Sequence, residues 1–573
     1  MARRPYAIPT LRIHESCASN APESGKGHRM LRSVGTGLAV AVGILALAVD
    51  SSAEPAKRPA VTAAAQVTTD PVPTRAHSSP VIARNPATGE LAIVEAEVRT
   101  DEQCVVHLSG DDGRSWFAGG SPMRKPFTDC SFHAEYGPYA AMAFGKDGTL
   151  YMAFVASEPG PARSEEAAAA GAGYTPRSVF LARSSDSGRS FTTANVFKAP
   201  SDNVDRGLNK GPTLAVDPSD SSRVYVGWHQ GSYSSKDEKK KSVVAASRDG
   251  GKTFSAPVDL SDKNGGDYPT MAVDAEGTLH AIYWSVNFPG FDFGDPKTPV
   301  SPIFYRQSTD NGRTFGRPVQ VDPGSQNSGR APVLATGTKP GVLYTVWSDT
   351  ADPKNLAKGF EGGKDIFFAA SRDGGKTWSR KRVLNDDRDL KVDQSLPGIS
   401  VAPNGRVDVA WYDDRFSPLG KDAGEDEPTA QNVFYTSSDD QGRTFTPNIR
   451  ISDRSIDRTI GVWANNIESN NYVGIDSTDE GVYFAWQDTR NADRRFQPED
   501  VYTAKLVPDR SSAVTGDDGS NVIWALLGGG AGLLLGGLLL LAAAGWIRRG
   551  TPEGVSERSG HPPPPTGSAA RPT

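Results

Sequence analysis

The stretch Ser371-Arg372-Asp373-Gly374-Gly375-Lys376-Thr377-Trp378 decides the fold of this chain. It has the form Ser-x-Asp-x-Gly-x-[Ser/Thr]-[Trp/Phe], and six copies occur along the 573 residues. The other copies begin at Ser109, Ser184, Ser247, Ser308 and Ser438, so successive copies start 75, 63, 61, 63 and 67 residues apart. A near-constant period of this size indicates a stacked or radial repeat architecture.

Each position of the motif has a local physical role. The carboxylate at position three can accept hydrogen bonds from N–H groups of its own turn, and glycine at position five permits a backbone shape that a side chain resists. The motif therefore predicts a rigid turn between two strands, with the final aromatic side chain returning to the core. We interpret its aspartates as structural: Asp111, Asp186, Asp249, Asp310, Asp373 and Asp440.

The motif resembles the Asp-box (BNR) repeat of sialidases and related β-propellers, and the resemblance covers residues 60–508. Each period opens with proline and an apolar strand, as at Pro212-Thr213-Leu214-Ala215, and an alternating strand such as 224–228 follows. A third strand, the Asp-box turn and a fourth strand complete the period. Four antiparallel strands per period predict an all-β propeller blade.

A seventh unit at 472–506 has no Asp box and supplies only three strands. Residues 65–70 read like the fourth strands of other periods, so we expect the N-terminal strand to complete the last blade and leave no open edge. This favours seven blades, whereas the sialidase resemblance implies six as the alternative.

The ends of the chain predict export and a membrane anchor. Apolar residues 34–49 precede the small residues Ser51-Ser52-Ala53, which is typical of a signal peptide, and Met30 is an alternative start. Residues 522–547 carry no charge and precede Arg548-Arg549, which predicts one spanning helix with its C-terminal end in the cytoplasm. The expected organisation is a signal region (1–53), a linker (54–62), the propeller (63–508), a stalk (509–521), the transmembrane helix (522–547) and a disordered tail (548–573).

Two further features depend on this location. Gly528, Gly532 and Gly536 have the spacing that lets two spanning helices pack as a homodimer, although a glycine-rich span without a partner is the favoured alternative. Cys104 and Cys130 form an even pair once Cys17 is removed with the leader. In an exported protein we expect them to form a disulfide, and two buried thiols are the alternative.

The functional face should lie opposite the Asp boxes, where second strands end. Three matching stretches occur there: Glu97-Val98-Arg99, Asp413-Asp414-Arg415 and Asp488-Thr489-Arg490. Blade five keeps Asp349 but has Ala351 at the arginine position. Because blades six, seven and one are neighbours in a closed ring, the three arginines could converge on an anionic ligand. The favoured alternative is that each arginine pairs with the acid two residues before it.

The resemblance implies further roles. Sialidases bind a carboxylate with three arginines, use a tyrosine nucleophile activated by glutamate, and use an aspartate as acid/base. Here Asp101 could supply the acid, and Tyr268, Tyr412 and Tyr472 are candidate nucleophiles by position. Ser78 stands where the family's first arginine would be.

Composition and residue spacing narrow the remaining classes of function. A formal net charge of −6 and the lack of a basic stripe give no case for nucleic acid. Histidine and cysteine spacing shows no zinc site. Carboxylates of the 413–431 loop could bind calcium, but we favour a solvated loop and expect no cofactor, and the lysines of 236–241 should also be solvated. We therefore predict a cell-surface, sialidase-like propeller that binds or hydrolyses glycans. A lectin-like module or a protein-binding scaffold is the alternative.

Overall fold

The computed structural model describes residues 59–508 apart from fifteen short gaps. These gaps are 70–74, 98–102, 123–139, 158–176, 201–208, 232–239, 264, 286–300, 325–331, 351–362, 388–391, 418–429, 462–471, 493–494 and 496–497. The predicted leader, stalk, spanning helix with its glycines, and tail lie outside this part of the chain. Within it, no helix is long and apolar enough to cross a membrane.

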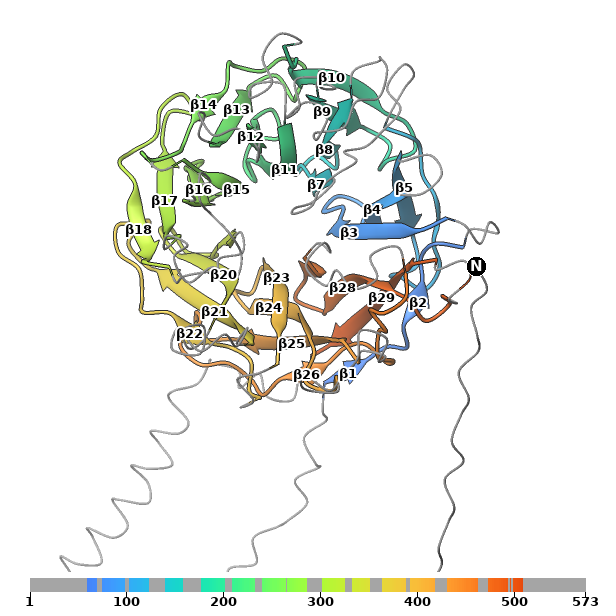
Figure 1. Cartoon of the computed structure of the whole chain (residues 1–573). Helices are drawn as coiled ribbons and strands as arrows, with labels where there is room; N and C mark the ends of the chain where they lie inside the picture. Colours follow the sequence, from blue (N-terminus) through green and yellow to red (C-terminus); the bar gives the residue numbers. More distant parts are fainter. Residues whose placement is uncertain are drawn as a thin grey trace, which may run out of the picture. The chain divides into compact units, whose positions relative to one another are not determined.

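The described residues form 29 strands in seven sheets around a central axis (Figure 1). From the axis outward, blades one to three contain β3 (His77–Arg84), β4 (Leu91–Glu97), β5 (Gln103–Ser109) and β6 (Phe117–Ala118); β7 (Ala140–Phe144), β8 (Leu150–Ser157), β9 (Arg177–Ser184) and β10 (Thr192–Phe197); and β11 (Asn209–Val216), β12 (Val224–Gln230), β13 (Lys241–Ser247) and β14 (Val258–Asp259). Blades four to six contain β15 (Asp267–Val273), β16 (Leu279–Trp284), β17 (Ile303–Ser308) and β18 (Val319–Asp322); β19 (Val333–Thr336), β20 (Leu343–Thr350), β21 (Lys364–Ser371) and β22 (Arg382–Val383); and β23 (Gln394–Val401), β24 (Val407–Asp413), β25 (Asn432–Ser438) and β26 (Ile449–Arg450).

Blade seven is assembled from both ends of the propeller, which confirms seven blades. It contains β27 (Gly474–Ser477), β28 (Val482–Asp488) and β29 (Asp500–Val507), and both β1 (Ala60–Val61) and β2 (Ala65–Gln66) pair antiparallel with β29. In Figure 1 these N-terminal strands lie beside the C-terminal ones. The closing strand at 65–66 was predicted, whereas β1 lies inside the segment predicted as a linker.

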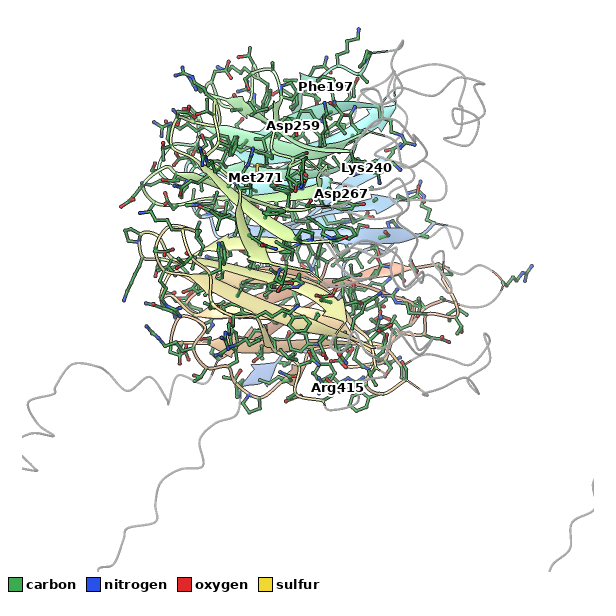
Figure 2. The ribbon with its side chains drawn as sticks, turned by 60° about the vertical axis from the view of Figure 1, so that its left-hand side comes forward. Phe197, Lys240, Asp259, Asp267, Met271 and Arg415 are labelled. Carbon is green, nitrogen blue, oxygen red and sulfur yellow. The ribbon has the colours of Figure 1, made fainter. Side chains whose placement is uncertain are left out.

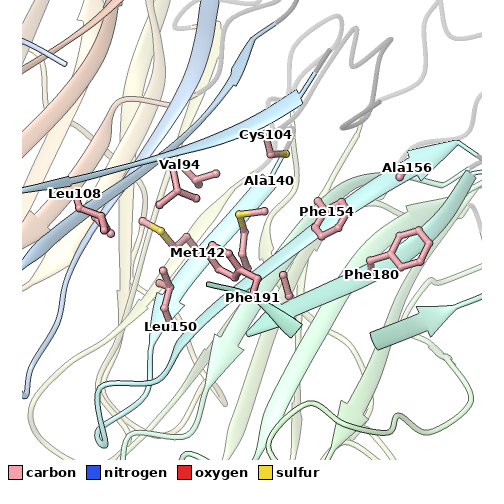
Figure 3. Close-up of a cluster of buried hydrophobic side chains, with 14 residues drawn as sticks. Val94, Cys104, Leu108, Ala140, Met142, Leu150, Phe154, Ala156, Phe180 and Phe191 are labelled. Carbon is pink, nitrogen blue, oxygen red and sulfur yellow. The ribbon is translucent and has the colours of Figure 1, made fainter. Parts of the chain in front are cut away.

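Second strands are buried on both faces because each blade packs between two neighbours. Every residue of β12 is buried, although its sequence suggested a strand with one apolar face. Between blades one and two, Val94 and Leu108 meet Met142, Phe154 and Phe180 in one apolar cluster (Figure 3). The outermost strands are exposed, as both residues of β22 show.

The Asp-box turns have the predicted hydrogen bonds. In the third copy, Asp249 Oδ1 accepts from the backbone N–H groups of Lys252 and Thr253, both at 3.0 Å, and Oδ2 accepts from the Thr253 hydroxyl at 2.6 Å. Ser247 Oγ accepts from Gly251 N at 2.8 Å. The Ser115 hydroxyl and N–H likewise lower the pKa of Asp111 to about 2, because they stabilise its ionised form.

The fifth-position glycine has a second role that the sequence did not show. Gly375 has a φ of +80°, its counterparts in the other five copies have φ between +76° and +100°, and a Cβ at Gly375 would lie 2.0 Å from the Tyr305 ring of the preceding blade. A Cβ at Gly442 would likewise clash with the Phe368 ring. The turn therefore needs glycine both for its backbone and for packing against the neighbouring blade.

Candidate functional site

Strand register defines two faces of the ring. First strands begin where second strands end, as the pairs His77 with Glu97 and Gln394 with Asp413 show. We call this end the loop face. The Asp boxes join third to fourth strands at the opposite end, which we call the Asp-box face.

Arg415 and Arg490 both pair with the aspartate two residues before them. Arg415 Nη2 lies 2.8 Å from Asp413 Oδ2, and Arg490 Nη2 lies 2.7 Å from Asp488 Oδ2. These contacts are the local ion pairs that the sequence analysis favoured. Arg99 and Asp101 lie outside the described residues, and Glu97 is buried at the end of β4. A ligand role for these residues stays a prediction.

The two arginines belong to a repeated arrangement. Arg415 lies over the Phe434 ring at 4.1 Å and Arg490 over the Tyr502 ring at 3.9 Å. Both rings stand opposite the tryptophan of the second strand. In blade five, which lacks the arginine, Lys381 lies over Phe367 and contacts Asp349 at 3.2 Å. A cation from the residue just before the fourth strand, β22, thus takes the place of the missing arginine.

A different, buried cation lies between blades six and seven. Arg458 follows β26 and its side chain is 1% exposed. Its Nε donates to Gln431 Oε1 at 2.7 Å, its Nη1 lies 3.6 Å from Glu499 Oε1, and its guanidinium lies 5.4 Å from the centre of the Tyr412 ring. Backbone bonds between Gln431 and Ile456 hold this segment against β25. Side chains from three other segments therefore converge on one guanidinium.

Asp414 gives this site a titratable carboxyl. Burial, followed by the charge of Asp393, raises the pKa of Asp414 to about 7, while Arg458 and Gln431 act in the opposite direction. Asp414 Oδ1 is buried and has no hydrogen-bond partner among the described residues. We call Tyr412, Asp414, Gln431, Arg458 and Glu499 the blade six–seven site. It can hold a proton near neutral pH beside a cation. From the sequence, Asp414 was only the middle residue of the Asp413-Asp414-Arg415 stretch and part of an acidic loop, with no role of its own.

The candidate tyrosines differ in their surroundings. Burial raises the pKa of Tyr412 to about 12, although Arg458 opposes this, so its hydroxyl stays protonated. Its oxygen accepts from the Gln487 N–H at 3.3 Å. Tyr268 and Tyr472 instead line an apolar cavity of about 190 Å³ in the central channel, together with residues from the inner strands of six blades. Tyr268 also has an unusual positive φ of 43° before its proline.

Two more buried ionisable clusters lie on the loop face. Glu95 Oε1 lies between His77 Nδ1 at 3.0 Å and His107 Nε2 at 3.1 Å. Burial opposes protonation of His77, but Glu95 raises the pKa of that imidazole to about 9. In blades three and four, Asp267 contacts His229 and lies 4.0 Å from Lys240 (Figure 2).

The structure also bears on the predictions for the lysine run, the acidic loop and the cysteine pair. Lys240 is buried rather than solvated, so the expectation for the 236–241 run is wrong at that residue. Asp414 is likewise buried, unlike the predicted solvated loop, and Asp422 to Glu427 lie outside the described residues. Cys104 is disulfide-bonded, and its predicted partner Cys130 is also outside them. In the part of the chain that the structure describes, no group of three histidine, cysteine or acidic side chains could hold a metal.

Comparisons with known proteins show fold likeness only. No model of a known protein family matches, and no curated protein matches. Similar solved structures include a protein of unknown function from Dyadobacter fermentans, with TM-score 0.41 and 13% identity over 78% of this chain and 99% of that chain. An α-L-arabinanase from Penicillium chrysogenum has TM-score 0.39 and 14% identity over 62% and 94%. A Trypanosoma rangeli sialidase has TM-score 0.36 and 12% identity over 64% and 54%. Values this low assign no activity to this chain.

Proposed function

We propose that this propeller acts on glycans at its loop face and hydrolyses a glycosidic bond in the blade six–seven site. The observation that carries the proposal is the buried Asp414 carboxyl, whose pKa is raised to about 7. Glycoside hydrolysis requires a carboxylic acid that remains protonated near neutral pH and a second, ionised carboxylate. Asp414 fits the first role, and Glu499, which faces Arg458, fits the second.

The proposed reaction breaks the bond between the anomeric carbon and the leaving oxygen, and protonated Asp414 gives its proton to that oxygen as the bond breaks. Glu499 acts on the opposite side in one of two ways: it takes a proton from the water that attacks the anomeric carbon, or it attacks that carbon itself and forms a glycosyl ester that water then hydrolyses. Arg458 holds Glu499 in place. All three side chains are buried, which strengthens their electrostatic interactions.

A panel of fluorogenic glycosides, including sialosides and arabinofuranosides, tests this proposal. We expect Asp414→Asn to lower kcat/KM by about 10²- to 10⁴-fold. Asp439→Asn, an exposed carboxyl of the sixth Asp box, is the matched control and should leave the rate unchanged. The wild-type rate should fall as pH rises through about 7, because the acid loses its proton. Turnover that is insensitive to Asp414→Asn would contradict the assignment.

Binding without hydrolysis is the second candidate. Ser78, at the position of the family's first arginine, is buried against Ser79 with 2.8 Å between their hydroxyl oxygens. Arg415 and Arg490 are already held by Asp413 and Asp488. These observations favour a lectin-like module. A glycan array that shows retention, with no turnover on the fluorogenic panel, would support it over the hydrolase.

We further propose a cell-surface location, which rests on the apolar segments 34–49 and 522–547. Protease treatment of intact cells that express the full chain should remove the propeller and leave a short membrane-bound C-terminal fragment. Recovery of the intact chain only in the soluble fraction would contradict this location.

A further inference from the structure

We propose that the Asp-box face docks on an anionic lipid bilayer through a basic surface on blade five. This inference does not depend on the proposed glycan chemistry, because it concerns the opposite face of the ring. The basic surface consists of five exposed side chains: Lys339, Arg372, Lys376, Arg380 and Arg382.

These cations come from separate segments of the sequence, and the folding of blade five brings them together. Lys339 lies in the turn between β19 and β20, and Gly374 N donates to Gly341 O at 2.9 Å, which joins that turn to the fifth Asp box. Ser379 N donates to Ala370 O at 2.8 Å and directs the segment with Arg380 back along β21. The five side chains therefore share one end of one blade.

The surface carries little negative charge of its own. The only carboxylate in 336–342 and 371–383 is Asp373. Asp373 accepts from Thr377 N and Ser371 Oγ, both at 2.9 Å, so its oxygens are directed into the turn. Arg372 and Arg382 donate to backbone carbonyls of blade six. None of the five cations forms an ion pair within the described residues.

The charge of the Asp-box face differs from blade to blade. In blade seven the equivalent turn carries exposed Asp479 and Glu480, and blade one adds Asp111 and Asp112. The whole chain has a formal net charge of −6, so a concentration of five cations on blade five departs from its average composition. With a basic surface on blade five and acidic turns on blades seven and one, this face would bind an anionic surface with blade five closest.

The position of the chain ends favours a bilayer as the partner. β29 ends at Val507, where Ala60 pairs with it, and Lys505 contacts Asp112 of the first Asp box at 2.6 Å. Both ends of the propeller therefore leave on the Asp-box face. Residues 508–521 separate it from the predicted span at 522–547, and fourteen residues reach at most roughly 50 Å in any conformation. The loop face would then point away from the membrane.

Vesicle sedimentation tests this proposal with residues 56–515, which contain every strand of the closed ring. We expect binding to phosphatidylcholine vesicles that contain phosphatidylglycerol, no binding to pure phosphatidylcholine, and weaker binding at higher salt. The triple variant Lys339→Gln, Lys376→Gln, Arg380→Gln should bind roughly 100-fold more weakly (about 3 kcal/mol at 1.4 kcal/mol per tenfold). These three side chains make no hydrogen bond that their loss would break within the described residues, and circular dichroism checks that the variant is folded.

A matched control removes three exposed cations of blades one and two, Arg114→Gln, Lys146→Gln and Lys198→Gln. This control should bind like the wild type. Equal loss in both variants would overturn the assignment to blade five, and equal binding to neutral vesicles would overturn the electrostatic basis. Retention of the protein by soluble heparin but not by anionic vesicles would show that the surface recognises a free polyanion, which also overturns the proposal. Inorganic phosphate at the same ionic strength should not displace the protein from vesicles.

Discussion

Asp111 on the Asp-box face and Asp414 on the loop face are the same side chain in opposite environments. Asp111 is exposed, receives hydrogen bonds from Ser115, and has a pKa lowered to about 2. Asp414 is buried beside Asp393 and has a pKa raised to about 7. Local donors stabilise the ionised form, whereas burial and a like charge stabilise the protonated form. The ring thus separates a structural face from a chemically responsive one.

Removal of the buried cation should show the largest difference between the faces. Arg458→Ala leaves Glu499 buried without the Arg458 guanidinium, which we expect to cost about 3–5 kcal/mol of unfolding free energy. Arg313→Ala, an exposed cation of the fourth Asp box, is the control and should change stability by less than about 0.5 kcal/mol. Urea denaturation measures both. Equal effects would show that burial does not distinguish the two faces.

Asp414 and the Asp-box carboxyls should contribute to the pH dependence of stability with opposite signs. Asp414 has a folded pKa of about 7 against 3.8 in the unfolded chain, so its contribution falls as pH rises from about 4 to about 7. Asp414→Asn should therefore gain roughly 2–4 kcal/mol relative to the wild type between pH 4 and pH 8. The Asp-box carboxyls contribute stability above about pH 4 that is lost as pH falls toward 2. If the unfolding free energies of the wild type and of Asp414→Asn change with pH in parallel, Asp414 does not have the raised pKa on which this contrast depends.

Loss of one Asp-box carboxylate should have a moderate effect. Asp249→Ala removes the acceptor for two backbone N–H groups and the Thr253 hydroxyl, and we expect a loss of about 1–2 kcal/mol. Asp249→Asn retains one carbonyl acceptor and should lose less. Thermal unfolding of both variants measures the order, and a larger loss for asparagine would contradict the hydrogen-bond account.

The smallest effect should come from the ion pair between blades one and seven. Asp112 is partly exposed and contacts Lys505 and the Tyr483 hydroxyl. Exposed pairs contribute little, so Asp112→Asn should lower stability by about 0.5 kcal/mol. Differential scanning calorimetry can resolve this value against the Asp249 variants. A loss that exceeds that of Asp249→Ala would make this contact the main closure of the ring.

Sequence reasoning succeeded where the chemistry is local. The bonds from Asp249 reach residues three and four positions away, so six copies of one motif sufficed to predict the turn. The closing strand at 65–66 was predictable because its pattern matched the other fourth strands. The local pairing of Arg415 with Asp413 was also among the stated alternatives.

Sequence reasoning failed where the contacting residues are far apart in the chain. Arg458 meets Gln431, Glu499 and Tyr412 across tens of residues, in segments without periodicity. Burial of Lys240 depends on Asp267 of the next blade, which a run of lysines cannot indicate. The basic surface of blade five was missed for the same reason, since its cations come from separate turns. The sequence signal that could have indicated the blade six–seven site is Arg458, an isolated arginine shortly after a fourth strand.

The pairing of β1 and β2 with β29 has a consequence for biosynthesis. Gln66 cannot find its partner Tyr502 until more than four hundred later residues have been made. Such a long chain separation gives ring closure a large loop-closure entropy and makes it a slow, late event. A ribosome-bound or prematurely terminated chain would therefore keep its first strands unpaired, and only a full-length propeller would conceal them from proteases and chaperones.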